Sequence, residues 1–343
     1  METVNAPPDL HAFLASAAPA VLAKAIAAIA RASLVVSDRI RRGALVGNMG
    51  ANVGPAHDGI AQKALDIFAH ERILTALRSA GVCAVLSEER DDPIVLDPQG
   101  SLLVAIDPLD GSNAIEANGL MGTFFSILDA KSGTFEPAHF FQKGAAQRAA
   151  GFTLYGPHTA FVFSCGGGVY AATLDPDGDL FRVTGRNVSI PAGTREFAIN
   201  ASNFRRWPAP VRAYVDECLD GVDGPREQDF NMRWTGAAVA EVYRILMGGG
   251  VYLYPEDSRP GYERGRLRLL YEASPIAFLI EQAGGAAIDG FQRILDIAPD
   301  TLHARTPLIF GSKDKVERVA RYYAEGSGER MAPLFGKRGL LRR

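Results

Sequence analysis

An apolar run that ends in two aspartates constrains the fold of this chain more than any other part of its sequence. Residues 104–113 read Val-Ala-Ile-Asp-Pro-Leu-Asp-Gly-Ser-Asn. The apolar residues before Asp107 are typical of a buried strand, and Pro108 predicts a turn where that strand ends. The turn would bring Asp107 and Asp110 together beside the Leu109 carbonyl, and hard oxygen donors of this kind are the ligands that Mg²⁺ prefers. The sequence therefore predicts a metal site at the end of this strand.

The residues that follow this turn suit a phosphate group. Free backbone N–H groups at Gly111, Ser112 and Asn113 would bind an anion, especially if they open a helix. Asp-Pro and Asp-Gly are also good turn formers, so the bare pattern fits an ordinary turn equally well. The similar segment 175–178 lacks both the apolar strand and the Gly-Ser sequence, and we interpret it as a plain hairpin turn.

A second pair of acids, Glu88 and Glu89, directly follows the apolar run 83–86. Adjacent carboxylates repel each other unless a cation or a proton relieves the repulsion, so we expect one to bind metal and the other to act as a base with a raised pKa. Asp66, in a predicted helix, and Glu272, after a predicted strand, are further candidates. Taken singly, each of these acids also fits a solvated surface position.

The spacing of apolar residues predicts an α+β fold in two parts. For the first part we predict helices over 19–40 and 60–79, a glycine-rich loop at 47–54, and strands at 83–86, 101–106, 123–128, 160–164, 166–173 and 180–183. For the second part we predict helices at 208–219, 237–247 and 275–283, a closing helix, and strands at 197–199, 250–254, 267–271 and 307–311.

The irregular stretch 185–193 is the expected boundary between the two parts. We assign residues 1–190 to an N-terminal α+β domain with a mostly antiparallel sheet and most of the candidate metal ligands. Residues 191–343 form a predicted C-terminal α/β domain, because strands and helices alternate there.

Composition excludes several classes of protein. The chain has 343 residues, of which 47% are hydrophobic and 22% charged, as in soluble globular proteins. Its 36 basic and 39 acidic residues give a net charge of −3, too even to favour nucleic acid or a membrane surface as a partner. Three scattered cysteines and the lack of an export signal predict a cytoplasmic protein. The sequence contains no P-loop, dinucleotide-binding, HExxH or GxSxG motif.

The acidic motifs resemble those of the lithium-sensitive, Mg²⁺-dependent phosphatase superfamily, which includes the inositol monophosphatases. The closest likeness is to class I fructose-1,6-bisphosphatase. It rests on Asp107-Pro-Leu-Asp-Gly-Ser with Ser87-Glu-Glu upstream, and segments 141–156, 249–255, 267–272 and 283–285 follow in the family's order. The resemblance implies a layered α-β-α-β-α sandwich, the sugar phosphatase fold with two α/β subdomains. It also implies hydrolysis of the 1-phosphate of fructose 1,6-bisphosphate, in gluconeogenesis or the Calvin cycle.

The resemblance assigns roles to individual residues of the N-terminal part. Two or more Mg²⁺ ions per subunit would be bound by Glu88, Asp107, the Leu109 carbonyl, Asp110 and Glu272. Glu89 matches the family's catalytic glutamate, and Asp66 matches the aspartate that helps it prepare the attacking water. The transferring phosphoryl group would contact Asp110, Gly111, Ser112 and Asn113.

A second group of residues is implied to bind the sugar and its other phosphate in the C-terminal domain. These residues are Asn200, Arg233, Trp234, Tyr254 and Arg266. In the family, the arginine that matches Arg233 reaches across a subunit interface, so the resemblance implies a homotetramer with a sugar bisphosphate as its small-molecule partner.

Three positions depart from the family's pattern and leave the substrate open. Asn113 replaces a second serine, Trp234 replaces a phosphate-binding tyrosine, and Arg266 replaces a lysine. Arginine keeps the charge and indole keeps one donor, so phosphate binding is expected to survive. The alternatives are sedoheptulose 1,7-bisphosphate, a broader range of sugar or inositol phosphates, and a catalytically silent sugar-phosphate sensor. The full set of acids disfavours the sensor, because clustered carboxylates destabilise a site that no longer binds metal.

Overall fold

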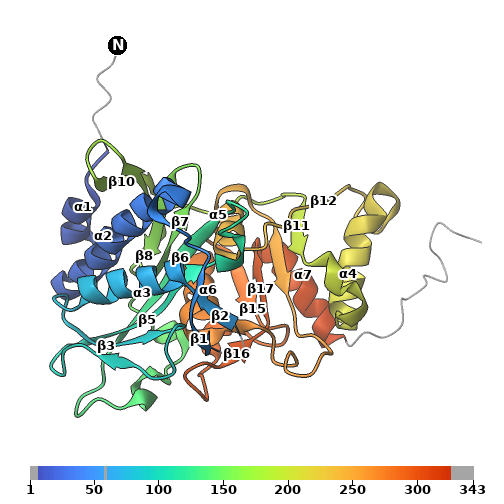
Figure 1. The fold of residues 1–343 in the computed structure, drawn as a ribbon. Helices are drawn as coiled ribbons and strands as arrows, with labels where there is room; N and C mark the ends of the chain where they lie inside the picture. Colours follow the sequence, from blue (N-terminus) through green and yellow to red (C-terminus); the bar gives the residue numbers. More distant parts are fainter. Residues whose placement is uncertain (1–6, 58–59, 326–343) are drawn as a thin grey trace, which may run out of the picture.

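Helices and sheets alternate in five layers in the computed structural model, which describes residues 7–57 and 60–325 (Figure 1). An eight-stranded sheet and a five-stranded sheet lie side by side. Helices α1, α2 and α3 cover the outer face of the larger sheet, α5 and α6 lie between the sheets, and α4 and α7 cover the outer face of the smaller sheet. The predicted α-β-α-β-α sandwich is therefore confirmed.

The helices begin and end close to the predicted positions in most cases. Asp9 caps the first of them by accepting a hydrogen bond from the His11 N–H at 2.9 Å. Their bounds are α1 Leu10–Ala17, α2 Ala20–Arg42, α3 Ala64–Leu77, α4 Ala209–Asp220, α5 Ala238–Gly248, α6 Ser274–Gln282 and α7 Lys313–Ala324.

Helix α2 belongs to the core of the fold. The segment Ala20–Val46 is long and apolar enough to cross a membrane, but 67% of its most apolar window is buried within the molecule. Small residues on the buried face, such as Ala25 and Ala28, let the helix pack closely against the larger sheet. The length and hydropathy of α2 are therefore explained by burial against that sheet.

The larger sheet has the strand order β10-β9-β8-β7-β6-β5-β3-β4. Its pairs are antiparallel except for β3 and β5, which run parallel with Ser87 opposite Ile106. This parallel pair makes the carboxyl ends of β3 and β5 meet at one edge. The strand bounds are β3 Val82–Ser87, β4 Ile94–Val95, β5 Leu102–Asp110, β6 Met121–Asp129, β7 Ala149–Tyr155, β8 Thr159–Ser164, β9 Tyr170–Asp175 and β10 Leu180–Arg186.

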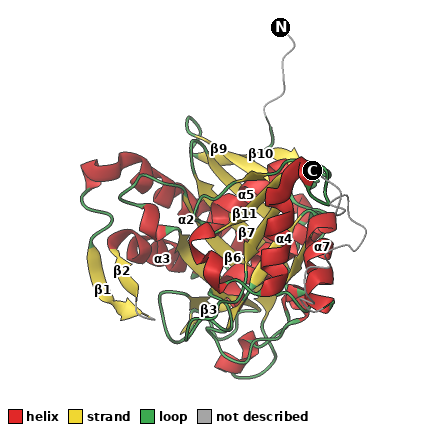
Figure 2. Cartoon of the chain, turned by 90° about the vertical axis from the view of Figure 1, so that its right-hand side faces the viewer, coloured by secondary structure: helices red, strands yellow, loops and turns green. Residues whose placement is uncertain are grey.

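The smaller sheet has the strand order β12-β11-β13-β17-β15. Strands β11 and β13 are parallel neighbours, so Ile199 and Tyr254 end at the same edge. The strand bounds are β11 Glu196–Ile199, β12 Asn231–Met232, β13 Val251–Tyr254, β15 Ala286–Ile288 and β17 Leu308–Gly311. Two further strand pairs lie outside the main sheets. Strands β1 Asn52–His57 and β2 Ile60–Lys63 form one pair, which projects from one side of the molecule in Figure 2. Strands β14 Leu267–Arg268 and β16 Arg305–Thr306 form the other.

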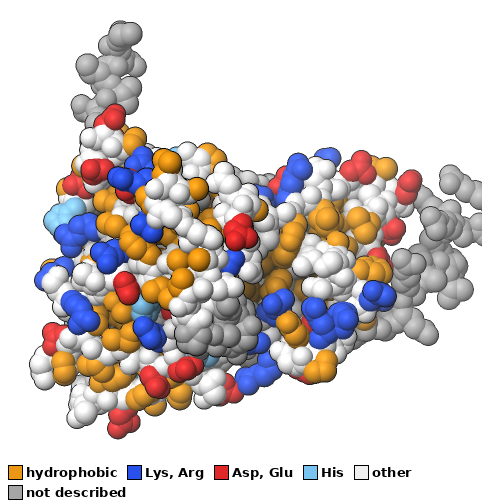
Figure 3. Space-filling model, viewed as in Figure 1, with side chains coloured by type: hydrophobic (Ala, Val, Ile, Leu, Met, Phe, Trp, Pro, Cys, Tyr) orange, Lys and Arg blue, Asp and Glu red, His pale blue; other side chains and the backbone are white. Residues whose placement is uncertain are grey.

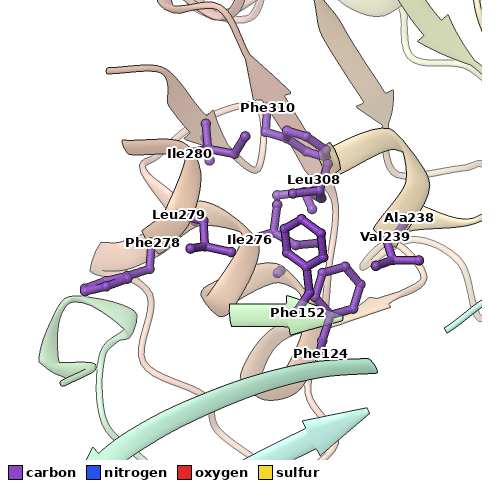
Figure 4. Close-up of a cluster of buried hydrophobic side chains, with 14 of the residues drawn as sticks. Phe124, Phe152, Ala238, Val239, Ile276, Phe278, Leu279, Ile280, Leu308 and Phe310 are labelled. Atoms are coloured by element: carbon purple, nitrogen blue, oxygen red, sulfur yellow. The ribbon is translucent and has the colours of Figure 1, made fainter. Parts of the chain in front are cut away.

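A continuous apolar core joins the two sheets through α5 and α6. Phe124 and Phe152 extend from the larger sheet, and Phe310 extends from the smaller one, with Ile276 of α6 between them (Figure 4). The rings of Phe124 and Phe152 lie 5.9 Å apart. This shared core fixes the two sheets relative to each other.

The structure corrects several boundaries expected from the sequence. Residues 60–63, predicted as the first turn of a helix, form β2 and pair with β1, so the predicted loop 47–54 also gives way to a strand at Asn52. The predicted strand 267–271 covers only β14, and Leu269–Ala273 form a π-helical turn. The predicted strand 166–173 starts at Tyr170, because β9 pairs with β10 only from there. Strands β12 and β16 are too short for apolar alternation to be visible.

Candidate active site

The Asp107–Asp110 segment is a bulge within a strand, where a strand end and a turn were predicted. Strand β5 continues to Asp110, but its register with β6 shifts between Asp107, which faces Phe124, and Asp110, which faces Gly122. Bulges re-aim side chains and recur beside active sites. Here the two residues between the aspartates, Pro108 and Leu109, form the bulge that brings the Asp107 and Asp110 carboxylates close to each other.

Hydrogen bonds hold this bulge in shape. The Leu109 N–H donates to Asp107 Oδ1 at 2.9 Å, and the Thr123 hydroxyl donates to the Pro108 carbonyl at 2.8 Å. Thr123 in turn lies 3.0 Å from the Tyr155 hydroxyl, in a fully buried setting. A buried polar network with its partners satisfied rigidifies the backbone that it contacts. The Leu109 carbonyl therefore sits in a fixed peptide between the two aspartates.

Gly111 closes the bulge and admits no side chain. Its φ of 85° lies in the left-handed region, and a Cβ there would be 2.9 Å from the Cβ of Ala237 and 3.0 Å from the Leu120 carbonyl oxygen. Ser112–Ala114 follow as a single 3-10 turn. Gly111 and Ser112 are half-buried, whereas Asn113 is exposed.

Glu272 joins Asp107 and Asp110 from the distant π-helical turn. One carboxylate oxygen from each of the three lies within 4.8 Å of the others. Glu272 Oε2 also accepts a hydrogen bond from the Arg268 N–H at 2.6 Å, which orients the carboxylate. Residues 162 positions apart in the chain, Asp110 and Glu272, thus meet in one buried cluster, since 272 minus 110 is 162.

Glu88, Glu89 and Asp66 complete the acidic cluster. The Glu88 N–H donates to the Ile106 carbonyl at 3.0 Å, and the Glu88 and Asp107 side chains are hydrogen-bonded to each other. Asp66 Oδ2 accepts from the Lys63 N–H at 2.9 Å. Burial raises the pKa of Asp66 and the Ser112 side chain partly opposes this shift, which places these two side chains near each other. The structure therefore brings together all the acids singled out in the N-terminal part of the sequence.

Burial raises the pKa of each carboxyl in this cluster. For Glu89 burial raises the pKa to about 7, with a further contribution from the Asp66 carboxylate, and for Asp66 burial raises the pKa to about 6. The pKa values of Glu88, Asp107 and Glu272 are raised by burial and then by repulsion from neighbouring carboxylates. The charged forms are thus disfavoured unless a proton or a cation is present.

A divalent metal ion is the group that this cluster fits best. The three clustered side chains offer only carboxylate oxygens, which suit Mg²⁺ or Mn²⁺ and exclude a zinc site of the thiolate type. Asp66 Oδ1 is buried and has no hydrogen-bond partner, so it is available to a further polar group such as water. The three carboxylates fit a metal ion, and the unpartnered Asp66 Oδ1 fits an ordered water molecule beside it.

We expect the gain in thermal stability from added Mg²⁺ to grow as the pH rises from about 5 to about 7.5. The unfolded chain releases these carboxyl protons near pH 4, whereas in the folded chain burial raises the pKa of two expected metal-binding residues, to about 7 for Glu88 and to about 6 for Asp110. Protonation therefore favours the folded state fully below the unfolded pKa, and this advantage is lost as the pH rises through the folded pKa. Melting curves in EDTA and in Mg²⁺ across this series test the prediction, and a Mg²⁺ effect independent of pH would contradict it.

The predicted sugar-phosphate residues are only partly brought together. Asn200, Tyr254 and Arg266 line one pocket at the end of β11 and β13. Trp234 lies next to them, with its ring stacked on Tyr254 at 6.1 Å between centroids. Arg233 does not line this pocket: its side chain is 55% exposed, and its Nε donates to Glu196 Oε1 at 3.2 Å.

Several residues near the site escaped the sequence analysis. Gln62 donates a hydrogen bond to the Glu89 carbonyl at 2.9 Å. The Ser87 hydroxyl lies 2.8 Å from His70 Nδ1 and accepts from the Glu89 N–H at 3.3 Å, which steadies the end of β3. Burial lowers the pKa of His70 to about 4, so this ring is neutral. Arg259 lines the sugar-phosphate pocket and pairs with Asp257, but as one of 36 basic residues it carries no sequence signal that could have found it.

The layered sandwich with acids at the ends of its strands defines this chain as a sugar phosphatase by fold, and comparison with known proteins specifies the family. Residues 11–185 match the family model "Fructose-1-6-bisphosphatase, N-terminal domain", and residues 190–324 match "Fructose-1-6-bisphosphatase, C-terminal domain". The chain belongs to the class I fructose-1,6-bisphosphatase family.

Individual relatives cover nearly the whole chain. Fructose-1,6-bisphosphatase class 1 of Rhodopseudomonas palustris (strain HaA2) is 50% identical over 323 residues, which are 94% of this chain and 93% of that protein. The corresponding protein of Paracoccus denitrificans is 50% identical over 324 residues, 94% of this chain and 96% of that one. The crystal structure of Leishmania major fructose-1,6-bisphosphatase in its holo form superposes with a TM-score of 0.86 at 30% identity, covering 93% of this chain and 99% of that one.

Proposed function

We propose that this protein hydrolyses the 1-phosphate of D-fructose 1,6-bisphosphate to give fructose 6-phosphate and phosphate, in a Mg²⁺-dependent reaction. The observation that carries the proposal is the cluster of Asp107, Asp110 and Glu272, whose oxygens lie within 4.8 Å of one another, beside a pocket with a basic side chain. The names of the relatives support the same substrate.

The cluster and the pocket are close enough to interact. Burial raises the pKa of Tyr254, Arg266 opposes the shift, and the Glu272 carboxylate adds to it. On the face shown in Figure 3, Lys and Arg side chains gather beside the hollow between the two halves of the molecule. A substrate with two phosphates can therefore span from the acidic cluster to basic groups, although the net charge of the chain is −3.

Two or more Mg²⁺ ions would be held by Glu88, Asp107, the Leu109 carbonyl, Asp110 and Glu272. When bound, the metal polarises phosphoryl oxygens and stabilises the charge that develops on the leaving oxygen. The chain's own contribution starts with Glu89, which accepts the proton of the attacking water, because a carboxyl with a pKa of about 7 is an effective base near neutral pH. Asp66, with one unpartnered oxygen, orients that water.

The remaining residues bind and orient the substrate. Backbone N–H groups of Gly111, Ser112 and Asn113 would hold the phosphoryl oxygens, as positioning and electrostatics dominate phosphoryl transfer. At the other end, the Arg266 guanidinium would pair with the second phosphate, while Asn200, Trp234 and Tyr254 would contact that phosphate and the sugar. Because Arg233 is exposed and turned from its own pocket, we propose that it reaches the site of a neighbouring subunit in a homotetramer.

We further propose that the chain divides into two domains near residues 185–193 and that the enzyme works in the cytoplasm. The division is supported by a stretch without helix or strand between β10 and β11. The location is supported by three free cysteines, none of which forms a disulfide.

Phosphate release from a panel of sugar phosphates across a magnesium series tests the proposed function. We expect fructose 1,6-bisphosphate to be cleaved fastest, sedoheptulose 1,7-bisphosphate more slowly, and fructose 6-phosphate and inositol monophosphate hardly at all, since only a bisphosphate engages both ends of the site. Preferred cleavage of sedoheptulose bisphosphate would reassign the substrate. No release from any compound at any Mg²⁺ concentration would favour a sugar-phosphate sensor.

A further inference from the structure

The loop between β12 and α5 carries both Arg233 and Trp234, and of these two only Trp234 packs against the apolar core through its side chain. Arg233, Thr235 and Gly236 are exposed, and Trp234 is half-buried. A loop this exposed needs an anchor if its side chains are to meet a phosphate in one geometry. The anchor is Glu241, which lies on α5 and whose side chain is fully buried.

Glu241 Oε1 binds the middle of the loop. The Thr235 N–H donates to it at 2.7 Å and the Thr235 hydroxyl donates to it at 3.0 Å. Hydrogen bonds to a charged acceptor are about twice as strong as neutral ones, and a buried carboxylate must be satisfied by such donors. Thr235 lies directly after Trp234, so these two hydrogen bonds fix the backbone from which the Trp234 indole extends.

The other oxygen of Glu241 begins a chain of alternating charges that ends at Arg233. Arg244 Nε donates to Glu241 Oε2 at 2.9 Å, and Arg244 Nη1 donates to Glu196 Oε2 at 2.8 Å. Glu196 Oε1 then accepts from Arg233 Nε at 3.2 Å. Side-chain exposure increases outward along the chain, from 0% for Glu241 through 19% and 28% to 55% for Arg233. The flexible surface arginine is thus connected to a buried carboxylate.

Helix α5 also touches the acidic cluster. The Val239 N–H, in the first turn of α5, donates to Asp110 Oδ2 at 2.8 Å. In the loop before α5, the Trp234 ring stacks on Tyr252, with 5.6 Å between ring centroids and 3° between ring planes, and on Tyr254, with 6.1 Å and 15°. The same short helix therefore contacts a residue of the acidic cluster and holds the loop beside the sugar-phosphate pocket.

We propose that Glu241 is a positioning residue for the remote end of the substrate: it fixes the loop that carries Arg233 and Trp234, and Arg244 and Glu196 extend this control to the Arg233 side chain. The inference rests on the proposed function for the identity of the substrate. Its physical reason is that Glu241 lies on a helix whose neighbouring residues Val239, Val242 and Ile245 belong to the apolar core. An apolar side chain at this position would fill space without the cost of burying a charge. We therefore assign the Glu241 carboxylate to holding the loop, through its hydrogen bonds to Thr235 and Arg244.

The test compares Glu241→Gln with Thr235→Val and with Glu281→Gln as a matched control. Glutamine is isosteric but presents an amide N–H₂ to the donors of Arg244, and valine removes one hydroxyl while leaving the charge in place. Glu281 lies near the end of α6 and also forms an ion pair, with Arg293, and among the described residues its side chain makes no hydrogen bond or ion pair with the loop or the acidic cluster. The readouts are calorimetric binding of fructose 6-phosphate, kcat and KM for fructose 1,6-bisphosphate, the half-saturating Mg²⁺ concentration, and hydrogen exchange of residues 233–237.

For Glu241→Gln we expect the Kd of fructose 6-phosphate and the KM to rise about tenfold, with kcat and the Mg²⁺ requirement nearly unchanged and with faster exchange in the loop. Thr235→Val should shift the Kd in the same direction by about threefold, and Glu281→Gln should leave it unchanged. A folded Glu241→Gln protein with wild-type Kd and wild-type loop exchange would overturn the proposal. So would equal losses in kcat, Kd and Mg²⁺ response, because these indicate a general loosening of the fold.

The proposed function and the anchoring role of Glu241 are tested by separate measurements. If the wild-type protein neither binds fructose 6-phosphate nor releases phosphate from the bisphosphate, the proposed function is wrong. Loop exchange then decides the role of Glu241 by itself: unchanged exchange in Glu241→Gln overturns the anchor, and accelerated exchange confined to residues 233–237 supports it.

Discussion

Replacing Glu89 by glutamine is expected to lower kcat for fructose 1,6-bisphosphate by roughly a hundredfold to ten-thousandfold, the usual contribution of a general base. Glutamine keeps the shape and the hydrogen-bonding reach of the side chain but cannot accept the proton of the attacking water. Because burial and the Asp66 carboxylate together raise the pKa of Glu89 to about 7, this group is well matched to proton transfer at neutral pH. Steady-state kinetics at saturating Mg²⁺ measure the effect.

The KM should change little in this variant, since Glu89 acts on the water and the substrate phosphates are bound by other residues. Glu71→Gln is the matched control, because Glu71 lies on the exposed side of α3 and undergoes the same chemical change. A Glu89→Gln enzyme with full activity would refute its role as a base. A tenfold or larger rise in KM with unchanged kcat would instead assign Glu89 to substrate binding.

Part of the acidic cluster could be predicted from the sequence, because some of its members lie at or just beyond strand ends that share one edge. Glu88 follows β3 and Asp107 lies near the end of β5, and a parallel pair of strands brings such ends together. The same rule explains why Asn200 and Tyr254 share a pocket, since β11 and β13 are also parallel. Apolar patterns that define strands therefore also locate the polar residues just beyond them.

Features that depend on irregular backbone could not be predicted in this way. Asp107 and Asp110 meet through a bulge, and Glu272 joins them from a π-helical turn, and neither feature changes the period of apolar residues. The sequence predicted that these acids matter, whereas the local backbone that aims them is set by tertiary hydrogen bonds, such as that from Thr123 to the Pro108 carbonyl.

Glu241 shows a second limit of sequence reasoning. In the sequence, Glu241 and Arg244 are an ordinary acid–base pair three residues apart on a helix, which is typical of an exposed helix face. In the fold Glu241 is fully buried and Arg244 is half-buried, and the partners of this pair come from residues 196 and 235. Burial of a charge is a property of the whole fold, so a charged residue with a positioning role is indistinguishable from a surface residue until the packing is known.

Replacing Asp110 by asparagine is expected to reduce kcat/KM about a hundredfold and to raise the half-saturating Mg²⁺ concentration about tenfold or more. The amide can still accept the hydrogen bond from the Val239 N–H, so α5 should stay in place. What is lost is one of the three carboxylate charges whose oxygens lie within 4.8 Å of one another, and the affinity of an oxygen-ligand site depends on its charge count.

The same substitution should raise the Tm of the metal-free protein, because removing one of several mutually repelling buried carboxylates relieves the cluster. A loss of activity together with a gain in metal-free stability separates a ligand from a merely structural residue, which would lose both. Asp129→Asn is the matched control: Asp129 ends the neighbouring strand β6, is 56% exposed and pairs with Arg148 at 2.8 Å. An unchanged Mg²⁺ titration in Asp110→Asn would show that Asp110 does not bind the metal. The hydrogen bond from the Val239 N–H would then connect α5 to a residue that lies outside the metal site.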